Sequence, residues 1–430
     1  MNNSNRIIDN IDWILVGLYL TFILFGWMNI FSAIYSPDLN LDFFNPSFYD
    51  TNPGKQLIWI GTSLILIILI LIVDYRIFET FAPIIYIILI GFLIIVPFLG
   101  VTVNGSHSWF KIGSFTLQPA EFAKTATSLL LAKYLSGPNI SLVKWSNLKW
   151  VAAIILFPMI LIIASNETGS ALVFGSFILV LYKEGLPGIY PSIILGLVVI
   201  LLLALLVDTL TVFYSLLVIS LIYLILQPIY VLRKISTYVK IGSIIGLVLI
   251  MTTSVDFLVN QVLQEHQRNR IKVLLNPNFD KRGLGYQVTQ SKIAIGSGGF
   301  FGKGYLNGTQ TKFDFVPEQS TDFIFCTIGE EFGFLGVFAL IFFYIFFIWR
   351  IFYKANLQKI KFARIYGYCI GGILFFHFFV NIGMTIGLVP IMGIPLPFYS
   401  YGGSSLWSFS ILLFIFIKLD SEKNNVLYHI

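Results

Sequence analysis

Long apolar runs separated by short polar segments dominate the chain, and they predict membrane-spanning helices. A helix needs about 20 apolar residues to cross roughly 30 Å of hydrocarbon. The runs are continuous rather than alternating, which indicates α-helices rather than strands of a barrel. Twelve apolar segments are predicted, at about 13–34, 56–74, 79–100, 118–136, 148–164, 168–183, 187–207, 211–230, 238–257, 323–350, 365–389 and 398–418. We therefore expect an all-α polytopic membrane protein, a helical bundle of 10–12 transmembrane helices, because removing the hairpin 187–230 leaves ten.

Composition and charge placement strengthen this expectation. Only 11% of the residues are charged and 57% are hydrophobic, whereas soluble domains carry about 25% charged residues. The net charge of +6 does not indicate a nucleic-acid binder, because the cations gather in alternate connecting segments. The remaining short connecting segments, which alternate with these, hold only two cations, Lys55 and Lys111. By the positive-inside rule both termini are cytoplasmic, and the long segment 258–322 is extracytoplasmic. The start "MNNSNRIIDNIDW" has no cleavage site, so we expect the first span to remain as an anchor.

Two polar groups interrupt the apolar pattern in the first half of the chain. In "LQPAEFAKTATSLLLAKYL", Glu121 and Lys124 are three residues apart and share a helix face. They form either a structural ion pair or a charged pocket wall reached from outside, where Gln118 opens the helix. In "SNETGSALVF", Glu167 lies in a turn that is either a plain connector or part of a site. The two cysteines, Cys326 and Cys369, are expected to be buried free thiols.

Two further polar groups lie near the C-terminus. In "DFVPEQSTDFIFCTIGEEFGFLG", a polar cluster precedes an apolar span, and Glu330 and Glu331 follow about two turns later. Charged residues at membrane depth usually face a cavity or a partner, so we predict that these two glutamates line a cavity. In "NIGMTIGLVPIMGIPLPFYSYGGSS", three prolines break the helix, with Asn381 and Thr385 at depth. Such a break needs shielding by protein or a watery cavity, and a transporter would also have one.

The long extracytoplasmic segment contains one isolated acid among cations. Asp280 is the only acid between Glu265 and Asp314. The cations around it are Arg268, Arg270, Lys272, Lys281, Arg282, Lys292 and Lys303. They suit anionic lipid headgroups or diphosphates, although a solvated basic loop would look the same. The stretch "GSGGFFGKG" lacks the spacing of a nucleotide-binding loop, which excludes that function. An ionised Asp280 is suited to accept a proton or to hold a metal ion.

Together these stretches resemble the SEDS family (shape, elongation, division and sporulation), the membrane-embedded peptidoglycan glycosyltransferases. The likeness rests on "SWFKIGSFTLQPAEFAK", "TGSALVF", "NRIKVLLNPNFDKRGLGYQVTQSKIAIGSGGFFGKG", "FVPEQSTDFIFCTIGEEFG" and "GLVPIMGIPLPFYSYGGSS". "GTQTKFDFVPEQ" and "NIGMTIGLVP" are more similar to the elongation branch than to the septal division branch. The likeness runs from Ser108 to the last span, so it implies one SEDS-type domain over 1–430, with the catalytic acid in 258–322 and a probable extra hairpin at 187–230.

The resemblance implies specific roles. Asp280 matches the essential catalytic acid of the family. Members of the family join lipid II units into glycan strands on the outer face of the bacterial cytoplasmic membrane. The expected partners are a class B penicillin-binding protein and other elongation-complex membrane proteins. The chain departs from the family pattern at Glu167, where an aspartate is usual, at Ser320, where a histidine is usual, and at Lys281, where a proline is usual.

We hypothesise that Asp280 is the general base that deprotonates the acceptor hydroxyl in an inverting glycosyl transfer. The lipid diphosphate that departs needs positive charge, and a divalent cation such as Mg²⁺ or Mn²⁺ is a further candidate for supplying it. The residues predicted to bind the substrate are Arg270, Glu121, Lys124, Lys292, Gln118, Glu318, Thr321 and Asp322. Three alternatives stay open: a lipid II flippase or other transporter, a septal rather than an elongation polymerase, and a non-enzymatic scaffold for the penicillin-binding partner.

Overall fold

A computed structural model describes most of the chain. The described residues are 10–35, 46–103, 106–113, 115–206, 209–226, 235–257, 265–276, 279–280, 283–313 and 315–423. The chain divides into two compact units. The first comprises residues 1–186 and 287–430, and the second comprises residues 187–286.

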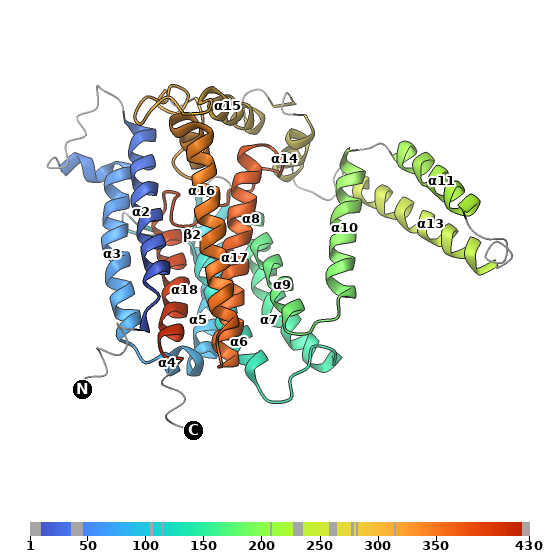
Figure 1. The fold of residues 1–430 in the computed structure, drawn as a ribbon, viewed down its shortest axis with the longest axis horizontal. Helices are drawn as coiled ribbons and strands as arrows, with labels where there is room; N and C mark the ends of the chain where they lie inside the picture. Colours follow the sequence, from blue (N-terminus) through green and yellow to red (C-terminus); the bar gives the residue numbers. More distant parts are fainter. Residues whose placement is uncertain are drawn as a thin grey trace. The chain divides into compact units, whose positions relative to one another are not determined.

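The first unit is a helical bundle whose helices coincide with the predicted apolar segments (Figure 1). Polar residues begin several of them: Asp12 caps α2 through the backbone N–H groups of Ile14 and Leu15, and Thr51 caps α3. The helices are α2 (Trp13–Ile34), α3 (Asn52–Ile72), α4 (Tyr75–Thr80), α5 (Ala82–Leu99), α6 (Pro119–Ser136), α7 (Trp145–Ala164), α8 (Thr168–Val173), α9 (Phe177–Lys183), α16 (Ile324–Asn356), α17 (Lys361–Thr385) and α18 (Gly403–Ser421), with 3₁₀ turns η1 (Pro46–Asp50) and η2 (Phe174–Ser176).

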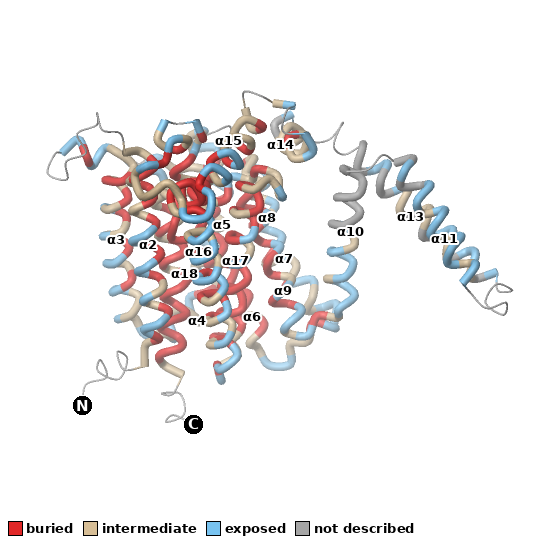
Figure 2. The backbone as a smooth tube through the Cα atoms, turned by 45° about the horizontal axis from the view of Figure 1, so that its top comes forward, coloured by how far each residue is buried: buried red, intermediate tan, exposed pale blue. Residues whose placement is uncertain are grey.

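The centre of this bundle is formed by α6, α17 and α18, which pack against one another. In α17 and α18, 78% of the spanning window is buried, compared with 22% in α3, α5 and α7. Figure 2 shows the same contrast, with buried residues along α17 and alternating buried and exposed residues along α3. The outer helices therefore present apolar side chains outward, as helices in lipid do. The polar residues of α6 lie in the centre of the bundle.

A small antiparallel sheet precedes α6, which the all-α prediction did not include. Its strands are β1 (Val101–Val103), β2 (Ser106–Ile112) and β3 (Phe115–Leu117), in the order β1-β2-β3. Gly113, at φ 64°, makes the turn between β2 and β3. Two of the strands, β1 and β3, have only three residues, too few for an alternating pattern that stands out beside the apolar spans. The sheet positions Gln118 at the start of α6.

The second unit contains the predicted hairpin and part of the segment 258–322, which was predicted to be extracytoplasmic. Its helices are α10 (Ile189–Leu206), α11 (Thr209–Leu226), α13 (Ile235–Phe257) and α14 (Glu265–Leu275). Both α10 and α11 contact α13. The helix α15 (Leu284–Ser297) begins in this unit and continues into the first. The described part of the segment 258–322, which was predicted as a loop, contains the helices α14 and α15.

Within the described residues, seven helices are long and apolar enough to cross a membrane, namely α2, α3, α5, α7, α16, α17 and α18. Three shorter apolar helical stretches are Thr168–Lys183, which comprises α8, η2 and α9, Tyr214–Leu226 within α11, and Thr237–Ile250 within α13. The prediction of a polytopic, mainly helical membrane protein is confirmed.

The beginning of the first span and the end of the last span lie at the same end of the bundle. Asp12, before α2, lies 2.8 Å from Lys354 near the end of α16, and Lys354 lies 3.2 Å from Asp420 near the end of α18. Arg350 also pairs with Asp12, at 3.0 Å. These three helix ends are therefore held together by one ionic network.

Candidate active site

Asp280 lies at the beginning of α15, where the backbone fixes its carboxylate. One carboxylate oxygen accepts the N–H of Gly283 at 2.8 Å, and the other accepts the N–H of Leu284 at 2.9 Å. Its carbonyl oxygen also accepts the N–H of Tyr286 at 3.0 Å. Free N–H groups and the helix dipole at this end of α15 favour a negative charge. The predicted catalytic acid is therefore an oriented, half-buried carboxylate.

A side chain at position 283 would displace this carboxylate. A Cβ added to Gly283 would lie 2.2 Å from an Asp280 oxygen, closer than two nonbonded atoms can approach. The glycine in "DKRGLGY" therefore has a steric reason, which is to leave room for the oriented acid.

The cations expected around Asp280 are partly described. Arg270 and Lys272 lie on α14 and are half-buried, and the Lys272 ammonium is 5.1 Å from the ring centre of Phe279. Lys281 and Arg282 lie outside the described residues. Lys292 is exposed on α15, and its ammonium lies 2.5 Å from where a Cβ of Gly387 would be. Gly387 follows the C-terminal end of α17, where a helix dipole favours a cation.

The Glu121–Lys124 ion pair is confirmed, and the structure adds a third member. The Lys124 ammonium lies 2.8 Å from a Glu121 oxygen and 2.9 Å from Nε2 of His377 on α17. All three side chains are 1% exposed. This burial favours the structural interpretation of the pair over a pocket wall open to the outside. His377 was not singled out from the sequence, although a histidine within the apolar segment 365–389 was a usable signal.

Gln118 connects this helix to the turn at Glu167. The Gln118 amide and the Ser170 hydroxyl both donate to the same Glu167 oxygen. Burial, reinforced by the nearby charge of Glu121, raises the pKa of Glu167 to about 7, although the Ser170 hydroxyl acts in the opposite direction. The turn at Glu167 is therefore more than a connector, because it lies against the start of α6.

The residues before α16 are hydrogen-bonded to the segment 386–402, the broken segment between α17 and α18. Asn381 donates to the carbonyl oxygens of Asp322 and Ile394, at 2.9 and 2.8 Å, and Ser400 donates to that of Thr321 at 2.6 Å. Glu318 is exposed, and its backbone φ is 57°. One of its carboxylate oxygens accepts a hydrogen bond from the Thr321 hydroxyl at 2.9 Å. Four of the five motif stretches thus converge in the first unit.

Glu330 and Glu331 do not form the cavity wall predicted for them. Glu330 accepts backbone N–H groups of Thr309, Gln310 and Thr311 at 2.7–3.0 Å and pairs with Lys303 at 2.6 Å. Glu331 accepts the Ser32 hydroxyl and, at 3.1 Å, the Leu306 N–H. Both carboxylates therefore anchor the segment 303–311 to the start of α16. The prediction was wrong because sequence spacing does not show which loop folds back onto a helix.

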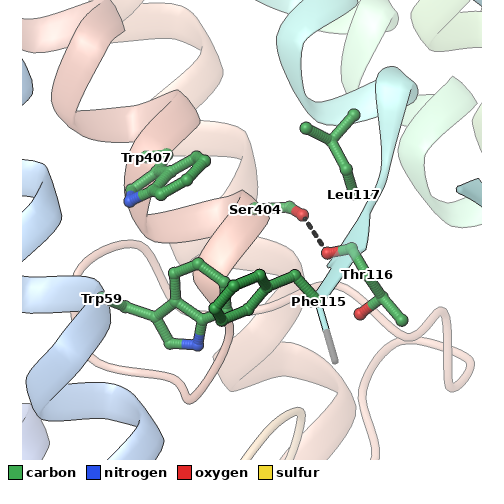
Figure 3. A pocket seen from close by; sticks show the side chains of 6 residues that line it. All are labelled: Trp59, Phe115, Thr116, Leu117, Ser404 and Trp407. Carbon is green, nitrogen blue, oxygen red and sulfur yellow. Dashed lines mark hydrogen bonds between the residues drawn. The ribbon is translucent and has the colours of Figure 1, made fainter. Parts of the chain in front are cut away.

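An apolar pocket lies beside the small sheet (Figure 3). Its volume is about 180 Å³, and it is lined by Trp59, Phe115, Thr116, Leu117, Ser404 and Trp407. Trp59 packs edge-on against Phe115 and Trp407, with ring centres 4.8 and 5.2 Å apart. The Ser404 hydroxyl donates to the Thr116 carbonyl oxygen at 2.9 Å. The pocket thus suits an apolar group.

The fold and these buried polar contacts define a polytopic membrane protein with a polar centre, and comparisons with known proteins specify its family. The FtsW/RodA/SpoVE family, described as cell cycle protein, matches residues 12–239 and 197–425. The peptidoglycan glycosyltransferase RodA of Treponema pallidum (strain Nichols) is 34% identical over 400 residues, covering 86% of this chain and 89% of that protein. The peptidoglycan glycosyltransferase MrdB of Escherichia coli (strain K12) is 32% identical, covering 81% and 80%.

Solved structures have the same fold. A chain from a peptidoglycan synthase complex, described by its coordination of polymerization and crosslinking, superposes with a TM-score of 0.68 at 25% identity, covering 96% of this chain and 98% of that one. The rod shape determining protein RodA of Thermus thermophilus gives a TM-score of 0.61 at 23% identity, covering 96% and 97%. The chain belongs to the SEDS family, represented by FtsW, RodA and SpoVE.

Proposed function

We propose that this chain is a peptidoglycan glycosyltransferase that polymerises lipid II into glycan strands for cell elongation. The relatives at 32–34% identity that are named RodA and MrdB support the activity and the elongation branch. The observation in this molecule that carries the proposal is the Asp280 carboxylate, which two backbone N–H groups orient at the start of α15.

In the proposed reaction Asp280 accepts the proton of the acceptor sugar hydroxyl as its oxygen attacks the anomeric carbon of the donor. The bond from that carbon to the lipid diphosphate breaks, and the configuration inverts. A carboxylate has about four acceptor positions, so it can accept backbone N–H groups and also interact with a hydroxyl. Arg270 and Lys292 balance charge on the departing diphosphate. Lys124 and Glu121 are both 1% exposed and paired with each other, so in this proposal they position the residues around them and do not contact the diphosphate.

A divalent cation is compatible with this arrangement as part of the proposal. The described residues hold no group of three His, Cys, Asp or Glu side chains suited to a metal. Mg²⁺, however, is commonly held by one or two carboxylates together with substrate phosphates. Asp280 is the residue that would hold it, and the ion would supply positive charge to the diphosphate.

The proposed setting is the bacterial cytoplasmic membrane, with both termini cytoplasmic and Asp280 on the outer side. The ionic network of Asp12, Lys354 and Asp420 supports an even number of crossings, because it joins the first and last spans at one end. We further propose a class B penicillin-binding protein and other elongation-complex membrane proteins as partners. The solved complex that couples polymerization with crosslinking supports the first of these partners.

The test is glycan polymerisation from purified lipid II by this protein in complex with its penicillin-binding partner. Loss of a positioned general base typically costs about 10²–10⁴ in rate, so we expect that loss for Asp280→Asn. Glu265→Gln is the matched control, because Glu265 is an exposed acid at the start of α14 in the same unit. Normal polymerisation by Asp280→Asn would move catalysis elsewhere. If the intact wild-type complex makes no polymer, the result would instead favour a lipid II flippase. Transport of labelled lipid II by the purified protein would detect that activity.

A further inference from the structure

His377 connects two groups of candidate site residues that come from different parts of the chain. Its Nε2 atom lies 2.9 Å from the Lys124 ammonium on α6. Its Nδ1 atom lies 3.1 Å from the carbonyl oxygen of Pro395, in the broken segment between α17 and α18. The side chain is 1% exposed. No role assigned so far to the polar cluster uses this imidazole.

The partners of His377 determine its tautomer. A carbonyl oxygen only accepts hydrogen bonds, so Nδ1 carries the proton that is donated to Pro395. An ammonium group only donates, so Nε2 is the acceptor for Lys124. A doubly protonated ring would direct an N–H at a cation, which leaves the neutral Nδ1–H form. The imidazole therefore accepts a hydrogen bond from Lys124 on α6 and donates one to Pro395 in the broken segment.

Lys124 depends on this acceptor for its position. An ammonium group has three N–H donors. One is directed to Glu121 at 2.8 Å and one to His377, and the ammonium also lies 4.9 Å from the ring centre of Phe409. Phe409 in turn packs edge-on against His377, with ring centres 4.8 Å apart. Without His377, a buried cation would lose an acceptor that no water replaces easily, and its side chain would move.

The other side of His377 leads to the residues before α16. Pro395 adjoins Ile394, whose carbonyl oxygen accepts the Asn381 amide at 2.8 Å. The same amide donates to the carbonyl oxygen of Asp322 at 2.9 Å. Hydrogen bonds through His377 and Asn381 therefore join the Lys124–Glu121 pair to the broken segment and to Asp322.

We propose that His377 is a positioning residue for glycosyl transfer, fixing the Lys124–Glu121 pair relative to the segment that holds Thr321 and Asp322. This inference rests on the proposed function, because its consequence is a change in polymerisation. Misplacing a positioning group by about 1 Å can cost about 10²-fold in rate. His377 itself does not contact the reacting atoms.

The conservative variant separates positioning from simple packing. In His377→Gln, the side chain stays neutral and offers one acceptor for Lys124 and one N–H₂ donor for the Pro395 carbonyl oxygen, so the chemistry of both contacts is retained. In His377→Leu, the volume is nearly kept and both bonds are lost. Tyr366→Phe is the matched control, because Tyr366 is a fully buried residue of α17 that donates one hydrogen bond, to the Leu412 carbonyl oxygen, and does not contact Lys124.

The experiment measures lipid II polymerisation by each intact complex, together with its thermal midpoint. We expect His377→Gln to stay within about threefold of wild type and His377→Leu to fall about 10²-fold, with Tyr366→Phe active. Because His377 acts through Lys124, the double variant His377→Leu/Lys124→Met should lose no more than the worse single variant. If Lys124→Met does not fold, the comparison of Gln with Leu decides alone.

Two failures are distinguishable. No polymer from the wild-type complex overturns the proposed function itself. Polymer from wild type, with His377→Gln as impaired as His377→Leu, overturns the positioning role. Multiplying losses in the double variant also overturn it, because they would show that His377 and Lys124 act independently.

Discussion

The carboxylate of Asp280 accepts the backbone N–H of Gly283 at 2.8 Å, within the turn that begins α15. This contact ties the orientation of the acid to the absence of a side chain at the glycine. Asp280, the proposed general base, is therefore also part of the turn that begins α15. The backbone N–H groups of Gly283 and Leu284 fix the orientation of its carboxylate.

We expect Gly283→Ala to inactivate the protein while Asp280 itself is unchanged. The new Cβ would lie 2.2 Å from the carboxylate, so the acid must rotate away or the turn must open. Polymerisation should fall about 10²-fold or more, as it does when a general base is removed. Gly296→Ala is the control on the same helix, because nothing lies within 4 Å of a Cβ there. Full activity of Gly283→Ala would show that the orientation seen here is not the working one.

A second prediction concerns the segment that Glu330 anchors. In Glu330→Gln, an amide group replaces one accepting oxygen, so at least one N–H of Thr309, Gln310 or Thr311 loses its partner. Hydrogen bonds to a charged group contribute roughly 1.5–3 kcal/mol each. The segment 303–311 should therefore open more often, and trypsin should cut faster after Lys303 or Lys312. Lys303→Met would remove the first of these cleavage sites. It would also remove the ion pair with Glu330 and the hydrogen bond to the Thr309 hydroxyl. The backbone N–H groups of Thr309, Gln310 and Thr311 would keep their acceptor, so this variant should expose the segment less. Unchanged cleavage at Lys312 in Glu330→Gln would contradict the anchoring role.

The sequence predicted the helices well because a membrane span is a local property. Twenty apolar residues cannot be satisfied in lipid except as a helix, so the predicted segments fall on observed helices. The segment 168–183 is divided into α8, η2 and α9, and α16 continues to Asn356, beyond the predicted end at 350. The pairing of Glu121 with Lys124 was also predictable, since a spacing of three places both on one helix face.

Contacts made by distant segments were not predictable in this way. His377 lies 253 positions from Lys124, and no local pattern indicates that α6 and α17 are neighbours. Glu330 and Glu331 had the right composition for a cavity wall, but the backbone of 303–311 folds back and uses their oxygens. The helices α14 and α15 were missed because their polar residues and glycines resemble a loop beside the apolar spans.

A third prediction concerns the ionic network at the ends of α2, α16 and α18. Burial alone would raise the pKa of Asp12, but hydrogen bonds from Lys354, Arg350 and the Leu15 N–H outweigh burial and hold this pKa below the usual 3.8. A lowered carboxyl pKa stabilises the folded state above the unfolded pKa, and this stability is lost as the pH falls through the folded value.

Asp12→Asn should therefore destabilise the protein at pH 7 and have less effect near pH 3. Breaking a buried ion pair costs about 3–5 kcal/mol, and we expect the lower end because the Arg350 and Lys354 side chains are 18% and 16% exposed. The measurement is the thermal midpoint in detergent at both pH values. Lys423→Met is the control, since Lys423 pairs only with the outer side of the network at Asp420. An equal loss at both pH values would rule out the charge-dependent explanation.

The last prediction follows from the pKa of about 7 that burial, reinforced by the charge of Glu121, produces at Glu167. Between the ordinary value of 4.5 and about 7, the folded protein binds a proton at this site that the unfolded chain does not. Stability should therefore fall as the pH rises through this interval. Glu167→Gln keeps an oxygen to accept from Gln118 and Ser170 but cannot ionise, so its thermal midpoint should change less between pH 5 and pH 8 than that of wild type. Glu184→Gln, at the Arg364 ion pair, is the control and should leave the wild-type slope intact. If Glu167→Gln and wild type lose stability in parallel, then Glu167 does not titrate in this range, and the turn at Glu167 does not carry a protonated carboxyl at neutral pH.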